Sequence, residues 1–214
     1  MKTIKVILFL TGLAFSQLVF SQSDAYSSAM MDAYSALKAD TDGTKLSGTC
    51  AQFERIAMAV KEHWLPFYYA SYTNVIRSFK ENDPKTKEQL VNHAQELIGE
   101  AFRLQGDSDE LMVLQGFIYL GKLTVEPKEK SAIYIQSANS CFQKAMSLNG
   151  KNPRAFYMEG TALFYTPEFY GGGKQRAKPF FEQAMKKYQS YVPATSLSPD
   201  WGMKECEKLL AACQ

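Results

Sequence analysis

The chain has 214 residues, a formal net charge of +2 at pH 7 and 13% aromatic residues. This length and aromatic content predict one globular domain with a sizeable core, and they exclude an intrinsically disordered chain. The near-neutral charge argues against a nucleic acid or an anionic membrane as partner, because either would require a basic surplus on one face.

The first 21 residues have the features of a secretory signal peptide. Lys2 and Lys5 precede an apolar run over residues 6–20, and Ser21 then offers the small residue at which a signal peptidase cuts. The alternative is a retained membrane anchor, which the short run and its polar residues disfavour. We therefore expect an exported protein, periplasmic or secreted, with no membrane span after cleavage and one helical domain over residues 22–214.

The four cysteines do not predict a fold that is held together by disulfides or by a metal. Cys50, Cys141, Cys206 and Cys213 are too few for a disulfide scaffold, and no pair has the spacing of metal ligands. Cys206 and Cys213 would lie too far apart along one predicted helix to form a bridge. A bridge from Cys50 to either of them stays open, and no metal site is expected.

Two helices are predicted before the first repeated unit. One covers residues 24–38 and ends at Thr41-Asp42-Gly43, where turn-forming residues cluster. The second covers residues 48–63, where Phe53, Ile56 and Val60 recur at steps of three and four residues.

Three helical hairpins follow, over about residues 64–106, 107–150 and 151–190. Their helices share one spacing of small and large apolar residues, which is Ala138-Phe142-Ala145 in the second hairpin and Ala177-Phe181-Ala184 in the third. Small residues let two helices approach closely while the large residue fills the space between them. A linker over residues 193–199 and a last helix over residues 200–213 complete the chain.

With this spacing the chain resembles the tetratricopeptide repeat (TPR) family over residues 64–188, although its turns are longer than the 34-residue family period allows. The resemblance implies an all-α fold, a short right-handed α-solenoid of antiparallel hairpins with about nine helices. It also implies that the first helix of each hairpin lines a concave surface. The residues predicted to face that surface and bind a partner are Trp64, Phe67, Asn74, Val113, Phe117, Leu120, Arg154, Tyr157, Phe164 and Tyr165.

This predicted surface is mainly aromatic and apolar. Such a surface suits an apolar peptide helix or a small hydrophobic ligand, and it also suits a terminal helix of the protein itself. The residues leave these alternatives open. Our first hypothesis is an exported interaction protein that binds a protein or peptide partner in the cell envelope. The alternative is an accessory protein of a solute-transport system that holds a small hydrophobic ligand.

No group of residues predicts catalysis. His63 and His93 have no metal-ligand partner at helical spacing. The glycines at 171–173 do not form a nucleotide-binding loop, because Glu168 and Gln175 stand where that motif requires Gly and Ser or Thr. We expect these glycines to permit a tight reversal, and we expect neither enzyme activity nor a cofactor.

Overall fold

The computed structural model describes residues 24–125 and 130–214, so the predicted signal peptide lies outside the described residues. The described part contains no strand and nine α-helices, which confirms the predicted all-α class. A helix over residues 24–39 comes first. It is followed by α2 (Leu46–Ala59), α3 (Trp64–Lys80), α4 (Pro84–Arg103), α5 (Ser108–Leu123), α6 (Ser131–Leu148), α7 (Pro153–Tyr165), the 3-10 turn η1 (Glu168–Tyr170), α8 (Lys174–Ser190) and α9 (Met203–Ala211). None of the described helices has both the length and the apolar character needed to cross a bilayer.

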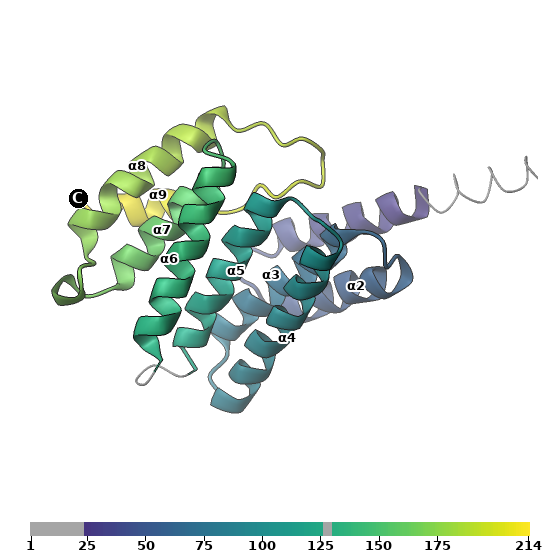
Figure 1. Cartoon of the computed structure of the whole chain (residues 1–214). Coiled ribbons are helices and arrows are strands. Elements are labelled where there is room, and N and C mark those ends of the chain that lie inside the picture. The colour runs from purple at the N-terminus through teal and green to yellow at the C-terminus, as the bar shows by residue number, and fades with distance from the viewer. Residues whose placement is uncertain (1–23, 126–129) are drawn as a thin grey trace, which may run out of the picture.

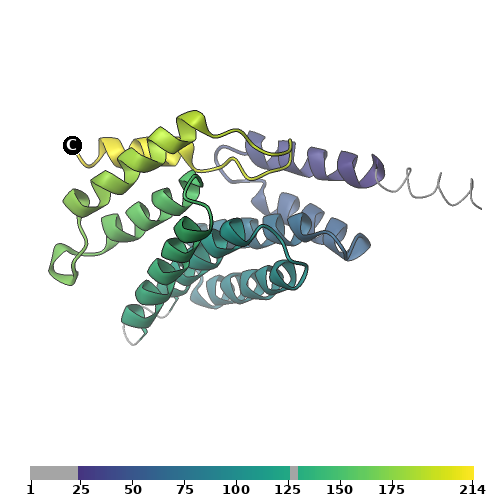
Figure 2. The same ribbon diagram turned by 45° about the horizontal axis from the view of Figure 1, so that its top comes forward.

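Consecutive helices pack against each other as hairpins, and the hairpins stack side by side (Figure 1). The closest pairs are α3 with α4, α5 with α6, and α7 with α8. Helices α3, α5 and α7 also contact one another in sequence order, so they form one layer, and α4, α6 and α8 form the other. Figure 2 shows the stack from a second side. The arrangement is the solenoid that the spacing predicts.

Local sequence signals explain where several helices begin. The side chain of Asp83 accepts a hydrogen bond from the Thr86 amide at 2.8 Å, and Pro84 occupies the first position of α4. The boundaries differ from those predicted at α2, which covers Leu46–Ala59 in place of residues 48–63, and at the start of α9. Helix α3 begins at Trp64 with Pro66 in its first turn, where a proline removes no intrahelical hydrogen bond. Helix α9 begins at Met203, after Gly202 turns the backbone at a φ of 101°.

The repeated small and large residues meet at the hairpin crossings. A Cβ placed on Gly116 of α5 would lie 2.3 Å from Cε1 of Phe142 on α6. The same contact recurs one hairpin later, where a Cβ on Gly160 would lie 2.8 Å from the ring of Phe181. Both rings are fully buried. In each of these two hairpins, a phenylalanine ring that packs directly against a glycine therefore sets the distance between the two helices.

Adding one methyl group at this crossing should destabilise the protein. We expect Gly116→Ala to lower the free energy of unfolding by about 1–3 kcal/mol, because Phe142 is surrounded by packed side chains and must be displaced. Gly99→Ala on α4 is the matched control, since a Cβ there meets nothing within 4 Å. It should raise stability by about 0.5–1 kcal/mol through helix propensity. Urea denaturation measures both values, and equal effects of the two substitutions would contradict the assigned packing.

All four cysteines are free thiols, which settles the bridge that the sequence left open. Cys50, Cys206 and Cys213 are buried, and burial raises the pKa of the Cys206 thiol to about 12. A thiol that stays protonated is a poor nucleophile, so these side chains serve the core as small apolar groups.

Candidate ligand-binding surface

Four aromatic side chains form a partly exposed row on the layer of α3, α5 and α7. We call Tyr72 and Phe79 of α3, Phe117 of α5 and Trp201 the aromatic row. Ring centroids lie 5.3 Å apart for Phe79 and Phe117, 6.2 Å for Phe117 and Trp201, and 4.8 Å for Trp201 and Tyr72. The planes within these pairs deviate by 15°, 29° and 25°. Phe79 is 43% exposed and the other three rings are partly exposed, so the row leaves aromatic surface accessible to a ligand.

Part of the same layer is covered by the protein's own chain. Residues 191–202, which we call the strap, run from α8 back to α3 and the first helix and then return to α9 (Figures 1 and 2). The Tyr69 hydroxyl donates to the Leu197 carbonyl at 2.6 Å, and the Tyr34 hydroxyl donates to Asp200 Oδ1 at 2.5 Å. The Lys38 ammonium lies 2.6 Å from Asp200 Oδ2. Extended chain therefore covers this end of the layer together with the first helix, whose Tyr34 ring lies 5.1 Å from the Tyr69 ring.

Trp201 fixes the end of the strap within the row. Its indole N–H donates to the Tyr68 hydroxyl at 3.0 Å, and its carbonyl accepts from the Tyr188 hydroxyl at 2.9 Å. Burial raises the pKa of Tyr68 and Tyr69 well above the ordinary tyrosine value. Both phenols therefore remain protonated across the physiological range, so Tyr69 continues to donate to the strap.

The ten residues predicted to face a partner separate into accessible and enclosed groups. Phe117 lies in the aromatic row, and Tyr157 is buried beside it with its ring edge-on to Trp201 at 6.4 Å. Phe164 contacts Tyr165, which is 71% exposed, at the end of α7. The half-buried members of the predicted set, which pack against core clusters, are Trp64, Phe67 and Leu120.

Three of the predicted residues are enclosed by the fold. Val113 is fully buried, and Asn74 donates to the Glu54 carboxylate and to the Ala70 carbonyl. Arg154 is also fully buried, and its Nε lies 2.9 Å from Glu110 Oε2. The ring of Tyr191 in the strap lies 4.6 Å from its guanidinium carbon. These positions therefore serve the interior of the fold.

Sequence reasoning missed three members of the row. Tyr72 and Phe79 are seven residues apart on α3, which is about two helical turns. Helical periodicity could therefore have placed both side chains on the same face. Trp201 lies in the strap, where no periodicity indicates which residue turns inward. Its large aromatic side chain was the only sequence signal for burial of Trp201.

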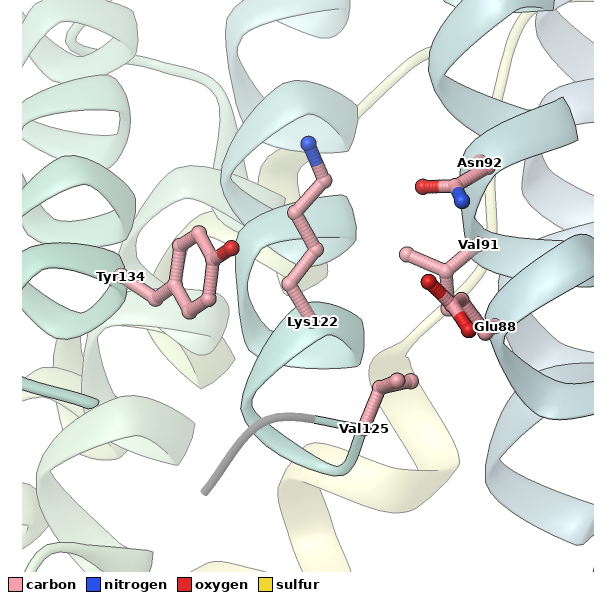
Figure 3. Close-up of a pocket in the computed structure, with 6 residues that line it drawn as sticks. All are labelled: Glu88, Val91, Asn92, Lys122, Val125 and Tyr134. Carbon is pink, nitrogen blue, oxygen red and sulfur yellow. The ribbon is translucent and has the colours of Figure 1, made fainter. Parts of the chain in front are cut away.

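Two hollows lie elsewhere and are lined by polar groups. One, of about 400 Å³, is bounded by α2, α3 and α4 and includes Glu54, Arg77 and His93. His93 Nε2 lies 3.0 Å from Glu54 Oε1 in this hollow. The other, of about 70 Å³, lies between Val91 on α4 and Tyr134 on α6 (Figure 3). Their charged linings do not suit a flat apolar ligand.

One carboxylate oxygen on α7 is buried without a hydrogen-bond partner among the described residues. Glu159 is 5% exposed, and its Oε2 has no hydrogen-bond partner among the described residues. Burial raises the pKa of this carboxyl to about 7. Gln115, which occupies the corresponding position before Gly116, exchanges hydrogen bonds with Gln95 at 2.8 and 2.9 Å. A neutral side chain is therefore preferred at this position.

The Glu159 carboxyl should make stability fall as the pH rises. The folded protein holds this proton more tightly than the unfolded chain, so the cost is absent below the unfolded pKa near 4.5 and complete above about 7. We expect a loss of about 3 kcal/mol between these values. Glu159→Gln should remove that loss, whereas Glu182→Gln on the exposed face of α8 should keep it. Urea denaturation from pH 5 to pH 8 measures the difference, and parallel curves for wild type and Glu159→Gln would contradict the assignment.

Comparison with known proteins identifies a relative. No family model matches the chain, and no curated protein sequence matches it, so the tetratricopeptide resemblance stays a prediction. The fold is similar to that of the HusA haemophore from Porphyromonas gingivalis, with a TM-score of 0.79 and 30% sequence identity. The match covers 88% of this chain and 92% of that one. The chain therefore belongs to the family of the HusA haemophore.

Proposed function

We propose that this protein binds haem or a related porphyrin by stacking the macrocycle on the aromatic row. The observation that carries the proposal is the chain of ring contacts that links Phe79, Phe117, Trp201 and Tyr72, in which Phe79 is exposed and the other three rings are partly exposed. A porphyrin is flat and apolar over an area that several such rings cover together. Stacked aromatic contact contributes about 0.5–1.5 kcal/mol per pair beyond the burial of area. The haemophore relative supports this class of ligand.

Stacking, and not coordination of the iron, is the interaction that this surface offers. His63 stacks on Tyr26 at 4.2 Å at the start of α3, and His93 lies in the polar hollow beside Glu54. Burial raises the pKa of Tyr72 well above its ordinary value, which opposes the phenolate form that would ligate iron. We therefore expect metal-free protoporphyrin to bind as well as haem.

The strap favours a small ligand over a peptide partner. A peptide partner would lie along the surface of α3, α5 and α7. Residues 191–200 of the protein itself already lie along one end of that surface and leave less room for a peptide. Between the sequence hypotheses, we therefore favour the hydrophobic ligand. We further propose that the protein is exported and carries its ligand without transforming it, as the haemophore relative and the signal-like leader support.

Titration of the purified protein with haemin, followed at the Soret band, tests the proposal. Phe79→Ser combined with Phe117→Ser should raise the Kd by about tenfold to a hundredfold, since two stacking faces are lost. His93→Ala is the control and should leave the Kd unchanged. Circular dichroism checks that the variants remain helical.

Three other results of the titration would change the proposed site or overturn the proposal. Loss of binding in His93→Ala, with binding retained by the double serine variant, would move the site to the polar hollow. Binding of haemin without binding of protoporphyrin would show that iron coordination dominates. Failure of the wild-type protein to bind either molecule would overturn the proposed function.

A further inference from the structure

The turn between α7 and α8 carries a second aromatic group that the proposed function does not use. We call residues 165–173 the tip. Tyr165, Phe169 and Tyr170 are 71%, 91% and 76% exposed, and the rings of Phe169 and Tyr170 contact edge-on at 5.3 Å. In Figure 1 this turn protrudes at the end of the molecule opposite the first helix. No described part of the chain covers these rings.

The tip is held in one conformation by its own backbone. The Gly173 amide donates to the Leu163 carbonyl at 2.8 Å, and the Arg176 guanidinium donates to the Gly171 carbonyl at 2.9 Å. A Cβ at Gly172 would lie 2.1 Å from the Thr166 carbonyl oxygen, so only glycine fits there. The exposed rings are therefore presented by a firmly held turn.

Basic side chains adjoin these rings. Helix α8 contains five basic residues and one acidic residue, and Lys174, Arg176 and Lys178 all fall in its first turns. Lys174 Nζ lies 5.9 Å from the centre of the Phe164 ring, beside Tyr165. The acidic group of the tip is Glu168, whose side chain lies against Gly173 at the start of α8. Tip and first turns therefore carry three positive charges and one negative charge.

We propose that the tip docks on a lipid surface that carries anionic headgroups. Exposed Phe and Tyr beside Lys and Arg are the residues that sit at a membrane interface, where rings enter the headgroup layer and cations pair with phosphates. Protein interfaces are also rich in aromatic residues and arginine, but lysine is depleted there, so Lys174 and Lys178 favour a lipid surface over a protein partner. The chain as a whole has a near-neutral charge of +2, so this surplus of basic residues is local to the tip and the start of α8. The docking does not depend on porphyrin binding.

Co-sedimentation of the exported protein with vesicles tests the docking. We expect binding to phosphatidylethanolamine vesicles that contain phosphatidylglycerol, and weaker binding to phosphatidylcholine vesicles. Phe169→Ser combined with Tyr170→Ser should reduce partitioning at least about tenfold. Met58→Ser is the matched control, because Met58 is 72% exposed on α2, away from the tip, and its loss should change nothing.

A charge variant separates the two contributions. Lys174→Glu with Lys178→Glu should abolish the preference for phosphatidylglycerol, and added salt should weaken wild-type binding. Haemin titration of the tip variants should match wild type, which distinguishes this surface from the aromatic row. Wild-type protein that fails to sediment with either vesicle, or a tip variant that binds as wild type does, would overturn the proposal.

Discussion

Arg154→Met should lower the free energy of unfolding by about 3–5 kcal/mol, the largest effect that we expect from one substitution. The guanidinium is fully buried and pairs with Glu110, which is 6% exposed. Methionine fills similar volume but leaves the Glu110 carboxylate enclosed without its cation. Asn152 Nδ2, which donates to that carboxylate at 2.8 Å, cannot replace the charge. Urea denaturation at pH 7 gives the value.

The matched control distinguishes a buried pair from an exposed one. Arg103 is 60% exposed and pairs with Glu100 at 2.8 Å on α4, so Arg103→Met should change stability by less than about 1 kcal/mol. Replacing both partners, by Arg154→Met with Glu110→Leu, should restore much of the lost stability, because no charge then remains buried. A double variant as unstable as Arg154→Met alone would show that packing and not charge dominates.

Trp201→Ala should cost about 2–4 kcal/mol and release the strap. The indole contacts the rings of Tyr72, Phe117 and Tyr157, and its N–H donates to Tyr68. Its loss removes both the stacking and the link between the strap and α3. Val192 in the strap is already 84% exposed, so a strap without its anchor should be cut rapidly by proteases.

Trp201→Phe is the companion to this variant. It keeps a stacked ring but loses the hydrogen bond to Tyr68 and the pyrrole part of the indole, so it should cost about 1–2 kcal/mol, less than Trp201→Ala, and leave the strap resistant. Limited proteolysis followed by mass spectrometry locates the first cuts. First cuts that map outside residues 191–202 in Trp201→Ala would show that Trp201 does not hold the strap.

The periodic parts of the sequence predicted the fold well, because buried residues of a helix recur with its turn. Gly116 and Phe142 belong to different helices, yet their contact follows from the repeated spacing, since Gly160 and Phe181 form the same pair in the next hairpin. The start of the last helix shifted by a few residues to Met203, because Gly202 turns the backbone just before it. The helices and their ends depend on residues that are close in the sequence, and for this reason they can be predicted from the sequence.

The candidate site was harder to predict because distant residues decide it. Helical phase placed Arg154 on the correct layer, but Tyr191 of the strap covers it, and its partner Glu110 lies in another hairpin. Trp201 completes the aromatic row from a segment without periodicity.

The strap also changes how this molecule should fold. A solenoid is held by contacts between neighbouring repeats, so its ends can fray without disturbing its middle. Here the Tyr34 hydroxyl and Asp200 are bonded across a sequence separation of 166 residues. That closure raises the contact order, which slows folding, and it couples the two ends of the stack. Loss of the first hairpin should therefore release the last one, and the chain should unfold in a single cooperative transition.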